Sequence, residues 1–93
     1  MMQQYRKKPI VINAVQFDGD GPGGTAFGHM FNAGLTADDY TYDKESRTMG
    51  LRDAGHYMVV NETDWVILGV KGEWYPCTDE IFQATYEPVQ LTL

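Results

Sequence analysis

Residues 64–76 contain two short runs rich in aromatic and β-branched residues, separated by a turn that glycines flank. Trp65 begins the first run, Trp74 begins the second, and Gly69 and Gly72 lie on either side of the turn. Such runs favour strands, and two of them joined by a short glycine-containing connection are typical of a β-hairpin. The sequence therefore predicts architecture better than function, since no metal-ligand cluster, nucleophile motif or phosphate-binding loop accompanies the hairpin.

Other segments extend the β-rich pattern on both sides of this hairpin. Residues 8–17 are apolar and β-branched, with Pro9 near the start, where a missing ladder donor costs least. Residues 40–51 predict a second hairpin around a polar turn, and residues 56–60 predict another strand. The alternating end of the chain, residues 87–93, is either an edge strand or a trailing segment.

Two segments favour short helices. Residues 25–34 place Phe27, Met30 and Phe31 on one helical face, with Thr25 as the predicted N-cap and Gly34 as the stop. Residues 78–86 begin with Thr78 as a second predicted N-cap. We therefore predict one α+β domain, residues 1–93, with a small twisted antiparallel sheet and one or two short helices on one face.

Length, cysteine content and the first residues favour a cytoplasmic protein. Ninety-three residues suit one modest core, and the single Cys77 cannot form an intramolecular disulfide. The polar opening, residues 1–8, lacks the apolar run of a signal peptide, and no later segment reaches membrane-spanning length. We expect neither a membrane partner nor a disulfide scaffold.

The charge balance argues against duplex nucleic acid as a partner. Thirteen acidic side chains against seven basic ones give a net charge of -6, which repels phosphates over much of the surface. Three of the seven basic residues, Arg6, Lys7 and Lys8, are consecutive. They are either solvated surface or part of a local anion site.

A tentative binding set combines cations with aromatic side chains. Lys71, at the predicted hairpin tip, could join the basic cluster around a compact phosphate ligand, and an aromatic platform beside it could stack on a base or a partner's side chain. The alternative for Trp65 and Trp74 is packing in the core. The candidate ligand- or partner-binding residues are Arg6, Lys7, Lys8, Lys71, Trp74 and Tyr75.

Catalytic and metal-binding patterns are weak. His29 and His56 have no second His or Cys at ligand spacing, so we predict no metal and no cofactor. Cys77 could act as a nucleophile with one of these histidines, but a small buried hydrophobe is the simpler interpretation because no local signature accompanies it. We name no catalytic residue.

Three segments resemble a family of small proteins that tailed bacteriophages and prophages encode. They are Tyr5-Arg6-Lys7-Lys8-Pro9-Ile10-Val11-Ile12-Asn13-Ala14-Val15-Gln16-Phe17, Asp64-Trp65-Val66-Ile67-Leu68-Gly69-Val70-Lys71-Gly72-Glu73-Trp74-Tyr75-Pro76-Cys77 and Ile81-Phe82-Gln83-Ala84-Thr85-Tyr86-Glu87. The resemblance covers about half of the chain and implies no established activity. Members carry glycine before the aspartate of the hairpin, where this chain has Thr63.

The resemblance implies action in the cytoplasm of an infected bacterium. By analogy with other small phage proteins, we expect a non-catalytic accessory protein, such as a counter-defence factor, that binds and neutralises a host component. One alternative is a sponge that sequesters a small anionic, nucleotide-like signal. A second is a small enzyme that uses Cys77 or a histidine. The partner is thus a host protein or a small anion, and homo-oligomer formation stays open.

Overall fold

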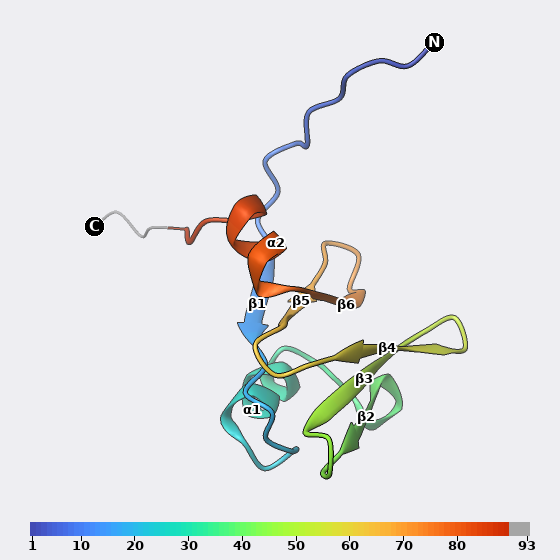
Figure 1. The fold of residues 1–93 in the computed structure, drawn as a ribbon, viewed down its shortest axis with the longest axis vertical. Coiled ribbons are helices and arrows are strands. Elements are labelled where there is room, and N and C mark those ends of the chain that lie inside the picture. The colour runs from blue at the N-terminus through green and yellow to red at the C-terminus, as the bar shows by residue number, and fades with distance from the viewer. Residues whose placement is uncertain (90–93) are drawn as a thin grey trace.

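The structure, a computed structural model, describes residues 1–89 and contains six strands and two α-helices (Figure 1). In chain order the elements are β1 (Asn13–Gln16), α1 (Thr25–Asn32), the 3₁₀ turn η1 (Ala37–Asp39), β2 (Tyr40–Asp43), β3 (Thr48–Asp53), β4 (His56–Val60), β5 (Trp65–Leu68), β6 (Trp74–Cys77) and α2 (Asp79–Thr85). The predicted α+β class is confirmed.

The strands divide between two antiparallel three-stranded sheets, whereas the sequence pattern suggested a single sheet. Sheet A has the order β1-β5-β6, and sheet B has the order β2-β3-β4. The chain leaves sheet B for sheet A at residues 61–64, a turn closed by a hydrogen bond from Asp64 N to Asn61 O. Thr63 adopts φ +79° there, which redirects the chain before β5 can continue sheet B.

The first strand is shorter than predicted. Residues 8–17 were expected to be extended and paired, but β1 contains only Asn13–Gln16. In the register of sheet A, Asn13 pairs with Leu68, the last residue of β5. The chain then turns, with Gly69 N donating to Glu73 O, so β5 does not extend opposite residues 8–12, and no other strand of residues 1–89 does. Together with the residues before them, they run outward from the body as an extended segment, residues 1–12, which we name the arm (Figure 1).

Helix α1 begins one residue earlier than its sequence suggested. Gly24 is the N-cap, so Thr25 is the first helical residue and not the cap. The C-terminus is as predicted: Gly34 adopts φ +107°, and the amides of Gly34 and Leu35 donate to the carbonyls of Phe31 and Met30. This Schellman arrangement satisfies carbonyls that a helix end otherwise leaves unpaired.

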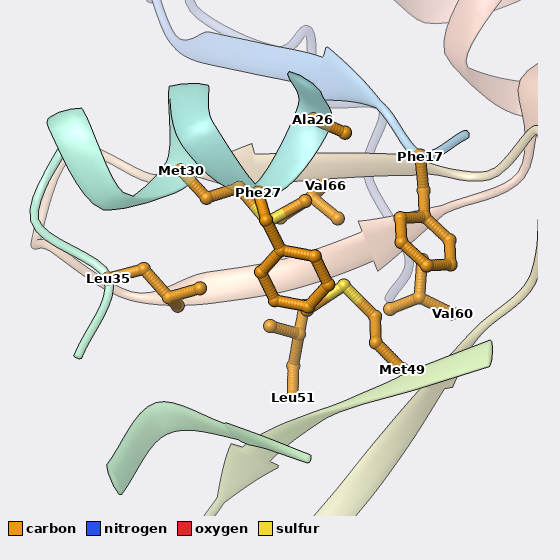
Figure 2. Close-up of a cluster of buried hydrophobic side chains, with 9 residues drawn as sticks. All are labelled: Phe17, Ala26, Phe27, Met30, Leu35, Met49, Leu51, Val60 and Val66. Carbon is orange, nitrogen blue, oxygen red and sulfur yellow. The ribbon is translucent and has the colours of Figure 1, made fainter. Parts of the chain in front are cut away.

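One apolar core joins α1 to both sheets, and Figure 2 shows its side chains converging. Phe27 lies at the centre and is fully buried, with its ring against those of Phe17, Tyr40 and Tyr42. Sheet A contributes Val66 from β5. The buried members of the core are Phe17, Ala26, Phe27, Met30, Leu35, Met49, Leu51, Val60 and Val66.

The two helices cover opposite faces of sheet A, whereas the sequence suggested that they share one face. Val66 faces α1 and belongs to the core. Trp65 is the neighbouring residue on β5, so its side chain points to the other face, where the Phe82 ring of α2 stacks on it. Helix α2 begins as predicted, because the Thr78 side chain accepts a hydrogen bond from Ile81 N.

The predicted hairpins and the strand at residues 56–60 are confirmed. Residues 87–89 form no strand, and the remainder of the predicted terminal edge strand lies outside the described residues. Among the helices of residues 1–89, none is both long and apolar enough to cross a membrane.

Candidate functional site

A stack of three aromatic rings covers the outer face of sheet A. Trp65 and Phe82 are parallel, with ring centroids 4.0 Å apart and an interplanar angle of 5°. Phe82 also contacts Tyr86, one helical turn later, at 5.1 Å. All three rings are half-buried. Aromatic side chains that keep part of their surface in solvent are common at binding surfaces, where they supply a large contact area.

Asp79 fixes the orientation of the stack from the first turn of α2. Its Oδ1 accepts hydrogen bonds from Trp65 Nε1 at 2.8 Å and from Gln83 Nε2 at 3.2 Å. The indole hydrogen bond, followed by that of Gln83, lowers the pKa of the Asp79 carboxyl below its ordinary value. The charged form therefore holds the indole and α2 in register at neutral pH.

Lys7 closes the other end of the stack. Its Nζ donates to Tyr86 Oη at 2.8 Å and lies 4.4 Å from the centroid of the same ring. This hydrogen bond is the main reason that the pKa of Tyr86 is lowered. Burial, with a smaller contribution from a hydrogen bond to Tyr86, raises the pKa of Tyr75 to about 12. The arm is thus tied to α2 and β6 through one cation and two phenols.

Between the arm and α2 lies a groove of about 610 Å³, which we name the α2 groove. Trp65, Phe82 and Tyr86 form its aromatic part, and the apolar residues of the arm and of the segment after α2 complete it. Its lining residues are Pro9, Ile10, Val11, Ile12, Ala14, Trp65, Phe82, Gln83, Thr85, Tyr86, Glu87, Pro88 and Val89. Val11 and Val89 are 71% and 67% exposed, so the groove presents apolar surface to solvent.

The residues predicted from sequence to bind a ligand do not all lie together. Lys7 and Tyr75 meet at Tyr86, as described above, and Arg6 and Lys8 flank Lys7 on the exposed arm. Lys71 lies in the turn between β5 and β6, where its backbone N donates to Glu73 Oε2. Trp74 neighbours Tyr75 on β6 and so points to the opposite face of sheet A.

Trp74 lines a separate pocket of about 340 Å³ between α1 and sheet A. His29 of α1 lies at this pocket, together with apolar side chains such as Met30 and Leu68. None of the other five candidate binding residues lines it. The predicted set is therefore divided between the two faces of one sheet.

The groups considered for catalysis are separated in the same way. Cys77 pairs with Trp65 in the register, which places its thiol on the α2 face, whereas His29 lies on the α1 face and His56 lies in sheet B. Burial, followed by the charge of Asp64, raises the pKa of Cys77, which keeps the thiol protonated. Within residues 1–89, no group of three or more His, Cys, Asp and Glu side chains is placed to hold a metal ion.

Sequence reasoning missed Phe82, Tyr86 and Val89 as candidate site residues. A usable signal was present for the first two, because residues four apart on a helix lie on the same face. No sequence signal indicated that residues 9–12 would lack a strand partner and form one wall of a groove. That outcome depends on where β5 ends.

Comparison with known proteins gives no relative for this chain: no family model, curated protein or solved structure matches it.

Proposed function

We propose that this protein is a non-catalytic phage accessory protein that binds a host protein through the α2 groove and neutralises it in the cytoplasm of the infected bacterium. The observation that carries the proposal is the α2 groove itself, which combines a half-buried aromatic stack with exposed apolar side chains. Protein interfaces are enriched in aromatic residues of this kind, surrounded by a polar rim.

The charges beside the groove specify the chemistry of the partner. Arg6, Lys7 and Lys8 immediately precede its first lining residue, whereas residues 13–93 carry thirteen acidic side chains and four basic ones. A partner that enters the groove therefore meets a basic edge on an otherwise acidic molecule. The complementary ligand is an apolar segment of a host protein that has acidic residues on one side.

An enzyme receives less support from the geometry. Cys77, His29 and His56 lie on different faces or sheets, and the raised pKa of Cys77 disfavours the reactive thiolate. A nucleophile needs a base within hydrogen-bonding distance, and these three side chains have no such arrangement among the contacts within residues 1–89.

Affinity capture with a matched pair of variants tests the proposal. Val89 and Val59 are similarly exposed, at 67% and 62%, but Val89 lines the α2 groove and Val59 lies on β4 of sheet B. Wild type, Val89→Asp and Val59→Asp are each used as bait in lysates of phage-infected bacteria, and the captured species are weighed by native mass spectrometry. Both variants add one negative charge to an exposed valine, so they differ in location alone.

We expect wild type and Val59→Asp to capture a host protein in stoichiometric amount. Val89→Asp should lose it, because binding in the groove would remove the aspartate charge from water without a compensating partner. Capture that survives Val89→Asp and disappears with Val59→Asp would move the interface to sheet B. Capture of no host protein by wild type would contradict the proposed function. Circular dichroism of the variants checks that each is folded.

A second candidate function is sequestration of a small ligand, favoured by the pocket that Trp74 and His29 line. Its volume of about 340 Å³ lies within the range of small-molecule sites. Since none of Arg6, Lys7, Lys8 and Lys71 lines it, the pocket gives no specific support to an anionic ligand. An adduct that wild type carries in native spectra and Trp74→Ala lacks would favour this function over host-protein binding.

A further inference from the structure

Within residues 1–89, no strand pairs with the outer edge of β1 in sheet A. Strand β1 is the outer strand in the order β1-β5-β6, and three of its four residues are exposed. The opposite edge strand, β6, lies against β3 and β4 of sheet B. Exposed edges readily pair with another strand, and natural proteins usually shield them with a charge, a proline or a bulge. Within β1 itself, the four residues Asn-Ala-Val-Gln provide none of these.

The backbone of β1 has hydrogen-bonding groups that point outward. Phe17, directly after β1, bonds to the two residues that precede β5: its N donates to Asp64 O, and its carbonyl accepts from Thr63 N. Bonding alternates along an antiparallel strand, so Val15 and Asn13 also face β5, whereas Ala14 and Gln16 direct their N–H and C=O groups to the outer edge. The arm continues this edge with Ile10, Val11 and Ile12, strand-forming residues that have no ladder partner in the described part of the chain.

The charge pattern around β1 favours a second copy of the same chain. Basic residues precede the apolar segment, and Asp18 and Asp20 follow it. Lys8 and Asp18 are equally distant from Asn13 in the sequence, and so are Arg6 and Asp20. Antiparallel pairing about Asn13 therefore places each basic end opposite an acidic end. Asp18 accepts from the amides of Asp20 and Ala26, and Asp20 already pairs with Arg47, in the turn between β2 and β3, at 3.2 Å. The Asp20–Arg47 ion pair is exposed, with about half of each side chain in solvent.

We propose that the protein forms a two-fold symmetric dimer in which the β1 edges of two copies pair antiparallel about Asn13, joining the two A sheets into one six-stranded sheet. Such a contact is isologous, since each copy contributes the same residues. The arm is held to its own chain by the hydrogen bond from Lys7 to Tyr86, so each copy presents both β1 and its own arm to the partner. The inference does not rest on the proposed function, because it uses the outward backbone groups of β1 and the arm, although side chains of the same residues line the α2 groove.

The mass of the protein in solution, and the effect of a proline in β1 on that mass, test whether two β1 edges pair. We expect light scattering and native mass spectrometry of wild type to give twice the chain mass of 10.5 kDa at micromolar concentration. Added salt should weaken the dimer, since the facing charges are exposed. Ala14→Pro removes one outward N–H and should give a folded monomer, because proline is tolerated on an edge strand where the N–H faces solvent. Val89→Asp, which is outside the edge, should leave the dimer mass unchanged.

Cysteine crosslinking tests the register and covers the case in which Ala14→Pro fails to fold. In a Cys77→Ser background, Asn13→Cys should form a disulfide-linked dimer on mild oxidation, because residues facing each other across the two-fold axis lie within disulfide reach. Thr41→Cys is the matched control, since Thr41 is an exposed residue of β2, an edge strand of sheet B. A monomer at all concentrations, a dimer that Ala14→Pro does not disrupt, or equal crosslinking at both positions would each overturn the inference.

Discussion

The two helices of this protein are almost equally long but pack in different ways. Helix α1 has eight residues, three of which are buried, and it contributes Phe27 to the centre of the core. Helix α2 has seven residues, all within the described part of the chain, and none of them is buried. Its contact with sheet A consists of a half-exposed ring stack and the hydrogen bond from Trp65 to Asp79. Tyr86, directly after the helix, accepts a hydrogen bond from Lys7 of the arm.

The difference is one of burial, and it fits the proposed binding role of the α2 face. On the α1 face, complete removal of apolar surface from water supplies the stabilisation that a chain of this size needs. On the α2 face, the rings keep solvent-exposed surface and have polar partners that hold their orientation. A binding surface needs side chains that are already oriented but still exposed, because less conformational entropy is then lost when a partner binds.

The largest expected effect is at the core. Phe27→Ala removes a fully buried ring that contacts four other aromatic rings, so it should lower the free energy of unfolding by about 3–5 kcal/mol. Urea denaturation followed by circular dichroism measures the loss. A loss below about 1 kcal/mol, the level of an ordinary substitution, would show that α1 is not the centre of the core.

Phe82→Ala is the corresponding change in α2 and should cost less, about 1–2 kcal/mol, because the ring is half-buried and stacked on one side. The same variant should lose the captured host protein while still folded. Equal destabilisation by Phe82→Ala and Phe27→Ala in urea would erase the distinction between the two faces.

The turn that separates the sheets offers a stabilising substitution. Thr63 adopts φ +79°, a conformation that costs a β-branched residue about 1 kcal/mol or more. Thr63→Gly should therefore raise the urea midpoint by relieving this strain. Thr41→Gly is the control: the same change in a regular strand should lower the midpoint, since glycine is unfavourable there. A lower midpoint for Thr63→Gly would mean that the threonine side chain makes a compensating contact.

The smallest effect concerns protonation on the α2 face. Lys7→Met removes the hydrogen bond that lowers the pKa of Tyr86, so that pKa should rise, whereas Lys8→Met should leave it unchanged. Carbon-13 NMR of the Tyr86 ring measures the pKa in both variants.

Because the pKa of Tyr86 is lowered in the folded state, ionisation of Tyr86 adds to the stability of the fold at alkaline pH, and this contribution is lost as pH falls through that pKa. Tyr75 acts in the opposite direction, since its folded pKa is about 12 and its contribution is lost as pH rises between about 10 and that value.

Local patterns were sufficient to predict the elements but not their arrangement. The hairpin turn with Gly72 at φ +83°, the Thr78 cap and the stop at Gly34 depend on neighbouring residues, and each is present as predicted. The length of β1 depends on where a distant strand ends, and the division into two sheets depends on the turn at Thr63. Neither the length of β1 nor the division into two sheets can be predicted from a short window of adjacent residues.

The candidate site shows the same limit. Lys7 and Tyr75 were predicted as binding residues, and both lie at Tyr86. Trp74 was grouped with Tyr75 because the two are adjacent in sequence, but adjacent residues on a strand point to opposite faces. The stack of Trp65 on Phe82 could not be predicted, because it joins residues of two elements whose packing is a tertiary property.

Photo-crosslinking in infected bacteria tests the α2 groove as a binding surface most directly. A photoreactive phenylalanine derivative is placed at Val89 in one version of the protein and at Val59 in another, and the crosslinked species are weighed by mass spectrometry. The account predicts one discrete adduct with a host protein from position 89 and none from position 59, because the two valines are similarly exposed and only Val89 lines the groove. A host adduct from position 59 alone, or from neither position, would contradict it.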